Sequence, residues 1–162
     1  MNFEHYQIFR YRLPFVNPIA MMGNHMSHRE GLILKLESVK GAVGFGEVAP
    51  FPGLSTEGLN EVLDELRQAI SVLRNTGVDL TFPAIPALLS DVAPSVLFGT
   101  ESAVLEMQAQ EQQTSVAQIL NSEAADAVAV QALLFGEKND IFSHAERAIA
   151  AGFRCLKLKV RS

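Results

Sequence analysis

The clearest pattern of hydrophobic and polar positions lies near the end of the sequence, over residues 148–160. A helical segment ends at Gly152, a residue that tolerates positive φ, and the eight residues after it favour an extended strand. Alternation with period two divides this strand into a largely apolar face and a face with two lysines. The second face comprises Phe153, Cys155, Lys157 and Lys159.

Two lysines separated by one residue have two interpretations. On a solvent-exposed edge strand, Lys157 and Lys159 would only oppose aggregation. A helix that returns directly into a strand is half of a β-α-β unit, however, and the strands of such units are normally covered on both faces. Inside a closed (β/α) barrel the amines would lie in a low dielectric and repel each other, which is how a lysine becomes a usable general base.

The preceding residues predict the rest of that unit. A continuous apolar run over 127–135 is typical of a strand covered on both faces, and a helix over about 139–152 would connect it to the lysine strand. We therefore predict two parts: an α+β domain over 1–125 and a β-α-β unit over 126–162.

In the first part, period-two patterns and turn residues predict an antiparallel three-stranded meander. Its strands are expected over 3–13, 31–38 and 43–48. Residues 15–30 contain proline and glycine and lack periodicity, so they predict a long loop. A second loop, over 49–53, is stiffened by two prolines.

Helical periodicity appears over 56–76 and again over 94–112. We expect Ser55 to cap the first helix and Gly77 to end it, and Thr114 or Ser115 to cap a short third helix. Glu106 lies among apolar neighbours, and we interpret it as a partly buried structural carboxylate.

Composition narrows the function classes. A hydrophobic content of 48% predicts a packed core, and a net charge of −5 argues against nucleic-acid or anionic-membrane partners. The apolar runs are too short to span a bilayer, and the sequence has no secretory pattern, so we expect a cytoplasmic protein. The single cysteine, Cys155, is interpreted as a small buried hydrophobe, and His25 and His28 as solvated loop residues rather than metal ligands.

Four segments occur in a fixed order along the chain. They are residues 29–34 (REGLIL), 44–55 (GFGEVAPFPGLS), 94–103 (PSVLFGTESA) and 156–160 (LKLKV). As an ordered set they resemble the enolase superfamily, and they are most similar to the o-succinylbenzoate synthases of its muconate-lactonising-type subgroup.

The resemblance implies an α+β capping domain followed by the first β-α-β of a truncated (β/α) TIM-type barrel. Two capping loops, around 18–27 and 49–55, would contact a small carboxylate substrate, with Met22, Gly23, Phe51 and Pro52 as the candidate contacts. It further implies that Lys159 removes the proton α to a carboxylate, while Lys157 tunes Lys159 and contacts substrate. In this subgroup a Mg²⁺ ion, held by three carboxylates on later strands, stabilises the enediolate.

The o-succinylbenzoate synthase reaction is loss of water from 2-succinyl-6-hydroxy-2,4-cyclohexadiene-1-carboxylate, in menaquinone biosynthesis. The sequence stops at Ser162, before any counterpart of the three metal-binding carboxylates, and a whole barrel takes roughly 250 residues. We therefore expect a fragment that holds no metal ligands and is inactive alone. It would be a truncated gene product, one half of a split gene that a C-terminal barrel half would complement, or a part of a longer sequence. Without that half, the last 35 or so residues are expected to be poorly ordered.

Two alternatives remain open. The same capping domain and lysine strand occur in dipeptide epimerases, N-succinylamino acid racemases and muconate cycloisomerases. A non-catalytic domain that binds a partner or a small anion through the capping loops is the other alternative, and in it Lys159→Ala would be silent.

Overall fold

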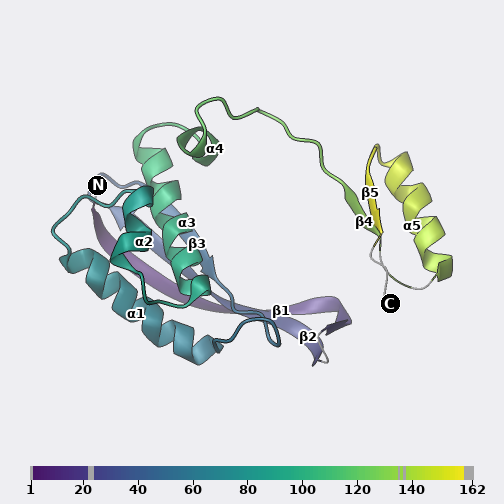
Figure 1. Ribbon diagram of the computed structural model, residues 1–162, viewed down its shortest axis with the longest axis horizontal. Coiled ribbons are helices and arrows are strands. Elements are labelled where there is room, and N and C mark those ends of the chain that lie inside the picture. Colours follow the sequence, from purple (N-terminus) through teal and green to yellow (C-terminus); the bar gives the residue numbers. More distant parts are fainter. Residues whose placement is uncertain (1, 22–23, 135, 137, 159–162) are drawn as a thin grey trace. The chain divides into compact units, whose positions relative to one another are not determined.

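The computed structural model describes residues 2–21, 24–134, 136 and 138–158, and the chain divides into two compact units, Met1–Ser122 and Glu123–Ser162. The first unit contains β1 (Phe3–Met21), β2 (Asn24–Ser38), β3 (Val43–Val48), α1 (Leu59–Asn75), a 3-10 turn (Phe82–Ala84), α2 (Ile85–Leu88), α3 (Pro94–Glu111) and α4 (Val116–Leu120) (Figure 1). The second contains β4 (Ala132–Leu134), α5 (Lys138–Ala150) and β5 (Leu156–Leu158).

The predicted meander is confirmed: β1, β2 and β3 form an antiparallel sheet in sequence order. Leu34 at its centre pairs with Ile8 on one side and Gly46 on the other. Alternate residues of β2 are fully buried against the helices, and these are Leu32, Leu34 and Leu36. The period-two pattern in β2 therefore marks the face of the sheet that α1 and α3 cover.

The loop predicted over residues 15–30 is wrong, because β1 and β2 continue as a long hairpin through this region. Pro14 pairs with His28 and Ile19 pairs with Met26, so residues 15–18 of β1 lie opposite a single residue of β2. Prolines cannot donate to a ladder and are tolerated at such irregularities on an edge strand. The bulge interrupts the alternation, which explains why periodicity did not reveal the strand. The candidate contacts Met22 and Gly23 lie outside the described residues.

The predicted helices agree with the sequence pattern except at one cap, and the short helix α2 was not predicted. Gly77 has a φ of +67° just after α1, and Pro94 begins α3, as predicted. Ser115 caps α4, with its Oγ accepting from Gln118 N at 3.2 Å. The cap of α1 is Gly58 rather than Ser55, and the Gly58 N–H donates to Glu61 at 2.8 Å.

Helix α3 packs directly on strand β3, backbone against backbone. A Cβ at Gly44 would lie 1.9 Å from the Ala103 carbonyl oxygen, and one at Gly46 would lie 1.7 Å from that of Gly99. A Cβ at Gly99 would in turn lie 2.4 Å from Val48. Because no side chain fits at these three positions, glycine is required for the observed separation of helix and strand.

Side chains of α3 also bind the outer edge of β3. The Phe45 N–H donates to Glu106 Oε2 at 2.5 Å, and the Val43 N–H donates to Gln110 Oε1 at 2.8 Å. These bonds occupy donors on the strand edge that would otherwise be free to pair with another strand. Glu106 is partly buried and has the structural role that the sequence predicted.

The second unit has the predicted order of strand, helix and strand, with β4 and β5 parallel and Leu133 opposite Lys157. Residues 127–131, predicted as strand, are not in one. Apolar side chains remain exposed here, including Leu133 (52%), Leu158 (50%) and Phe142 (67%). Cys155 is also exposed, which contradicts the predicted burial, because it lies just before β5, whose three residues are all exposed. None of the helices in the described part of the chain is long and apolar enough to cross a bilayer.

We expect Gly46→Ala to destabilise the first unit by about 2 to 3 kcal/mol, because the new methyl group overlaps the Gly99 carbonyl and must displace α3. Urea denaturation followed by circular dichroism measures the change. Gly58→Ala is the matched control: its Cβ would meet nothing closer than 3.4 Å, so a loss below about 1 kcal/mol is expected. Equal losses in the two variants would contradict the close-packing interpretation.

We also expect amide hydrogens of β4 and β5 to exchange much faster than those of β3. A two-stranded sheet is marginally stable in water, whereas β3 is held by both β2 and α3. Hydrogen-exchange mass spectrometry of the whole chain makes the comparison. Protection at 156–158 equal to that at 43–48 would show that the second unit is stable by itself.

Candidate functional site

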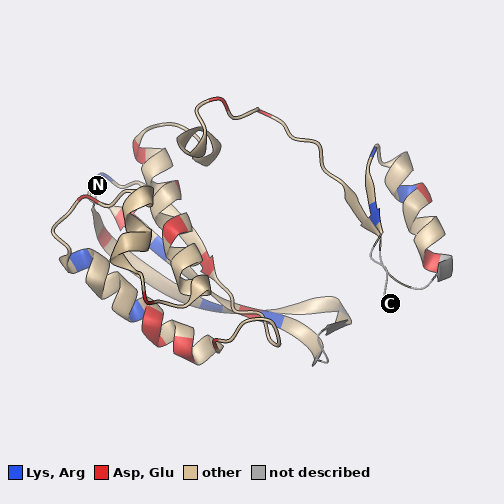
Figure 2. Cartoon of the chain, viewed as in Figure 1, with Lys and Arg blue, Asp and Glu red and all other residues tan. Residues whose placement is uncertain are grey.

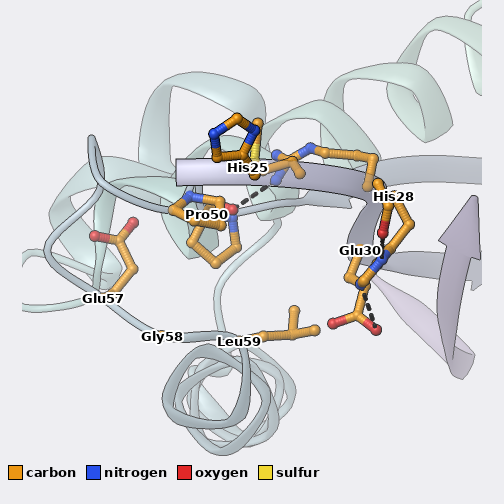
Figure 3. Close-up of a pocket in the computed structure, with 11 residues that line it drawn as sticks. His25, His28, Glu30, Pro50, Glu57, Gly58 and Leu59 are labelled. Atoms are coloured by element: carbon orange, nitrogen blue, oxygen red, sulfur yellow. Dashed lines mark hydrogen bonds and ion pairs between the residues drawn. The ribbon is translucent and has the colours of Figure 1, made fainter. Parts of the chain in front are cut away.

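A cleft of about 320 Å³ lies where the β1–β2 hairpin meets the loop after β3 and the start of α1. Its lining comes from residues 25–30 of β2, from Pro50 and Pro52, and from residues 57–59. In Figure 3, Pro50 lies beside His25, and Gly58 and Leu59 lie opposite them. The two loops expected to contact substrate therefore border one cleft.

Arg29 connects the two sides of this cleft. Its guanidinium donates to the Pro50 carbonyl at 2.7 Å and to the Ala49 carbonyl, and it stacks 5.3 Å from the centre of the Phe51 ring. The β2–β3 pairing ends at Leu32 and Val48, and Pro50 has no N–H with which to extend it. Arg29 thus binds three consecutive residues, 49–51, that follow the end of β3 and are not paired in the sheet.

The loop after β3 is closed by a local turn. The N–H groups of Leu54 and Ser55 donate to the Phe51 carbonyl at 3.0 and 2.9 Å, and the Phe51 N–H donates to Ser55 Oγ at 2.9 Å. Ser55 is committed to this turn, which is the reason it does not cap α1. Of the two candidate contacts in the loop, Pro52 is exposed at the cleft and Phe51 is half-buried beside Arg29.

Glu57 joins the cleft to the start of α3. Ser95 Oγ donates to Glu57 Oε1 at 2.8 Å, and this hydrogen bond holds the pKa of the Glu57 carboxyl below its usual value. Arg29 and Glu57 also line a neighbouring hollow of about 330 Å³. A cation and an anion at the junction of the two cavities suit a ligand with both polar and apolar parts.

Acidic and basic residues are interspersed along the first unit (Figure 2), and four of them form a network on the hairpin. Glu30 accepts from Arg12 at 3.2 Å and lies 3.7 Å from both Arg10 and His28. His28 Nδ1 also lies 3.1 Å from the Arg12 guanidinium. The interpretation of His28 as a solvated loop residue is therefore wrong: it is a half-buried strand residue with charged neighbours.

Tyr11 reaches across β2 to β3. Its hydroxyl donates to Glu47 Oε1 over Gly31, where a Cβ would lie 2.5 Å from the Tyr11 oxygen. Burial, together with the hydrogen bond and the charge of Glu47, raises the pKa of Tyr11 to about 12. Hydrophobic periodicity contains no signal for this pair, since the contact depends on the register Tyr11–Gly31.

The candidate catalytic lysines belong to the second unit. Lys157 is exposed in β5, and Lys159 lies outside the described residues. In the part of the chain that the structure describes, no three histidine, cysteine, aspartate or glutamate side chains come together as metal ligands. The described residues therefore do not fit a Mg²⁺ site.

Comparison with known proteins gives the family. The model of the MenC N-terminal domain matches residues 3–107, which include both loops of the cleft, Arg29 and the α3–β3 packing. The chain belongs to the MenC N-terminal domain family. The resemblance to o-succinylbenzoate synthases of the enolase superfamily is thereby confirmed.

Two o-succinylbenzoate synthases show the extent of the likeness. The protein of Haemophilus influenzae is 30% identical over 103 residues, covering 64% of this chain and 30% of the relative. That of Klebsiella pneumoniae is 29% identical over 154 residues, covering 95% of this chain and 41% of the relative. This MenC-family chain thus spans less than half the length of these relatives.

A solved structure shows the shared fold. The dipeptide epimerase of Enterococcus faecalis, in complex with Mg and the dipeptide L-Leu-L-Tyr, has a TM-score of 0.83 and 20% sequence identity, and the match covers 100% of this chain and 46% of the epimerase. The antiparallel sheet and helices of the first unit are those of an enolase-superfamily capping domain.

We expect Tyr11 to ionise near pH 12, about two units above a free phenol. In the Tyr6→Phe background it is the sole tyrosine of a chain without tryptophan, so phenolate absorbance follows it directly. The pKa of Tyr11 is higher in the folded chain than in the unfolded chain, so the neutral hydroxyl stabilises the folded state. This stabilisation is complete below pH 10 and is lost as the pH rises towards 12.

Glu47→Gln should lower that midpoint towards 10, because it removes the charge that opposes the phenolate. Glu37→Gln, on the same sheet but bonded to Lys35, is the control and should leave it in place. An unchanged midpoint in Glu47→Gln would show that Glu47 does not raise the pKa of Tyr11.

Proposed function

We propose that this chain supplies the capping domain and the first β-α-β segment of an enolase-superfamily enzyme that forms o-succinylbenzoate by dehydration. The observation that carries the proposal is the shared cleft, in which the hairpin and the 49–55 loop lie together through Arg29. The MenC family match and the o-succinylbenzoate synthase relatives support the reaction.

In this proposal the substrate is a small carboxylate covered by the capping loops. Lys159, as the neutral amine, takes the proton α to the carboxylate and becomes an ammonium. Lys157 contacts the substrate and favours the neutral form of its neighbour by charge repulsion. The hydroxyl group then takes up a proton, which the Lys159 ammonium can return, and leaves as water to give the aromatic product. Met22, Gly23, Phe51 and Pro52 are the proposed substrate contacts in the loops.

The second unit is the proposed start of the (β/α) barrel. Its exposed leucines on β4 and β5 are the residues that further strands and helices would cover. We propose that the rest of the barrel, on this polypeptide or on another, completes both the fold and the site. The metal ligands of the family reaction would come from that part of the barrel.

A second reaction has equal structural support. The fold is shared with a dipeptide epimerase, and removal of the same α-proton with its subsequent return gives epimerisation or racemisation instead of dehydration. Dipeptides and N-succinylamino acids are therefore alternative substrates, and muconate cycloisomerisation is a further alternative reaction. The two reactions share the removal of the α-proton and act on different substrates, so the loops of this chain that contact the substrate take part in the choice between them.

A chimera tests the proposal. This chain replaces the aligned N-terminal part of the Klebsiella pneumoniae synthase, and dehydration is assayed beside epimerisation of L-Leu-L-Tyr and racemisation of N-succinylamino acids. We expect dehydration, and we expect Lys159→Ala to reduce kcat by about 10²-fold to 10⁴-fold, because it removes the general base.

Arg154→Ala is the matched control, since it removes a cation three residues from Lys157 on the other predicted face of the strand. It should retain activity. Racemisation without dehydration would select the alternative reaction. A folded chimera whose Lys159→Ala variant keeps full activity would disprove the role of the lysine.

A further inference from the structure

We propose that Arg29 is a positioning residue that fixes the 49–55 loop against the β1–β2 hairpin and thereby sets how the two loops meet the substrate. This inference rests on the proposed function for its substrate, but its geometry belongs to the first unit alone. Neither candidate loop residue, Phe51 or Pro52, is placed by the sheet, because the β2–β3 pairing has already ended at Val48.

The position of Arg29 on β2 makes the link direct. The same strand carries His25 and Met26, which line the cleft from the hairpin side and pair with Ala20 and Ile19 of β1. Arg29 therefore keeps a fixed position relative to the hairpin. The contacts of its guanidinium then fix the position of the 49–55 loop relative to the hairpin.

Three contacts from one side chain hold the loop. The guanidinium donates to the carbonyls of Ala49 and Pro50 and stacks on Phe51. Pro50 is buried, so its carbonyl needs a partner, and as a proline it has no N–H to return to the sheet. The two carbonyls and the ring together define both the position and the rotation of the chain at 49–51.

Arginine is specifically suited to this role. Its planar fork donates to two acceptors at once and stacks on an aromatic face, whereas a lysine ammonium is a single point charge on a flexible stem. A lysine at this position would keep the charge and lose the paired geometry. Comparing Arg29→Lys with the natural residue thus separates positioning from simple charge.

The first test uses the whole 162-residue chain and needs no activity. In Arg29→Lys, amide exchange at Phe51, Leu54 and Ser55 should become about tenfold faster, since their turn is no longer tied to β2. Exchange in β3 should stay unchanged. Arg12→Lys is the control, because Arg12 lies on the same hairpin and binds Glu30 and His28 instead of the loop. Unchanged protection at 51–55 in Arg29→Lys would overturn the proposal.

The second test uses the chimera. Arg29→Lys should raise KM and reduce kcat/KM by about 10-fold to 100-fold while the unfolding midpoint stays near that of Arg12→Lys, because misplacement of a substrate-contacting loop weakens binding and orientation. Faster exchange with unchanged kinetics would show that Arg29 holds the loop without positioning substrate, and would overturn the inference. A chimera without activity whose loop is still loosened by Arg29→Lys would refute the proposed function and leave the positioning of the loop supported.

Discussion

Direct contact between the backbones of α3 and β3 is the constraint on which the rest of the first unit depends. It exists because Gly44, Gly46 and Gly99 have no side chains to separate helix from strand. Glu106 and Gln110 then bind the strand edge, so β3 is fixed on one side by β2 and on the other by α3. Strand β3 ends at Val48, and the loop that borders the cleft follows it.

The segment after β3 is held by side chains instead of by a ladder. Arg29 binds the carbonyls of Ala49 and Pro50, which lie beyond the β2–β3 pairing, and Ser95, at the start of α3, binds Glu57 just before α1. Two of the four sequence segments that carry the family resemblance thus line the cleft, and a third, 94–103, lines the neighbouring hollow. Their residues are explained first by packing and hydrogen bonding, and the proposed capping function uses the geometry that results.

The sequence predicted those features that arise from local periodicity and backbone preference. The meander, α1, α3 and the stops at Gly77 and Pro94 follow from hydrophobic spacing and from residues with restricted or permissive φ. Features that depend on register or on competition between partners were missed. The bulge at 15–18 obscured the long hairpin, the local turn diverted Ser55 from α1, and Tyr11 meets Glu47 only because Gly31 lies between them. The catalytic roles of Lys157 and Lys159 stay predictions.

The most direct test of the proposed chemistry is a crystal structure of the chimera with o-succinylbenzoate bound. The proposal requires the Lys159 amine to lie about 3 to 3.5 Å from the ring carbon that lost its proton, with the 49–55 loop over the ligand. Amines of Lys157 and Lys159 that both point into bulk solvent, away from the bound product, would contradict it.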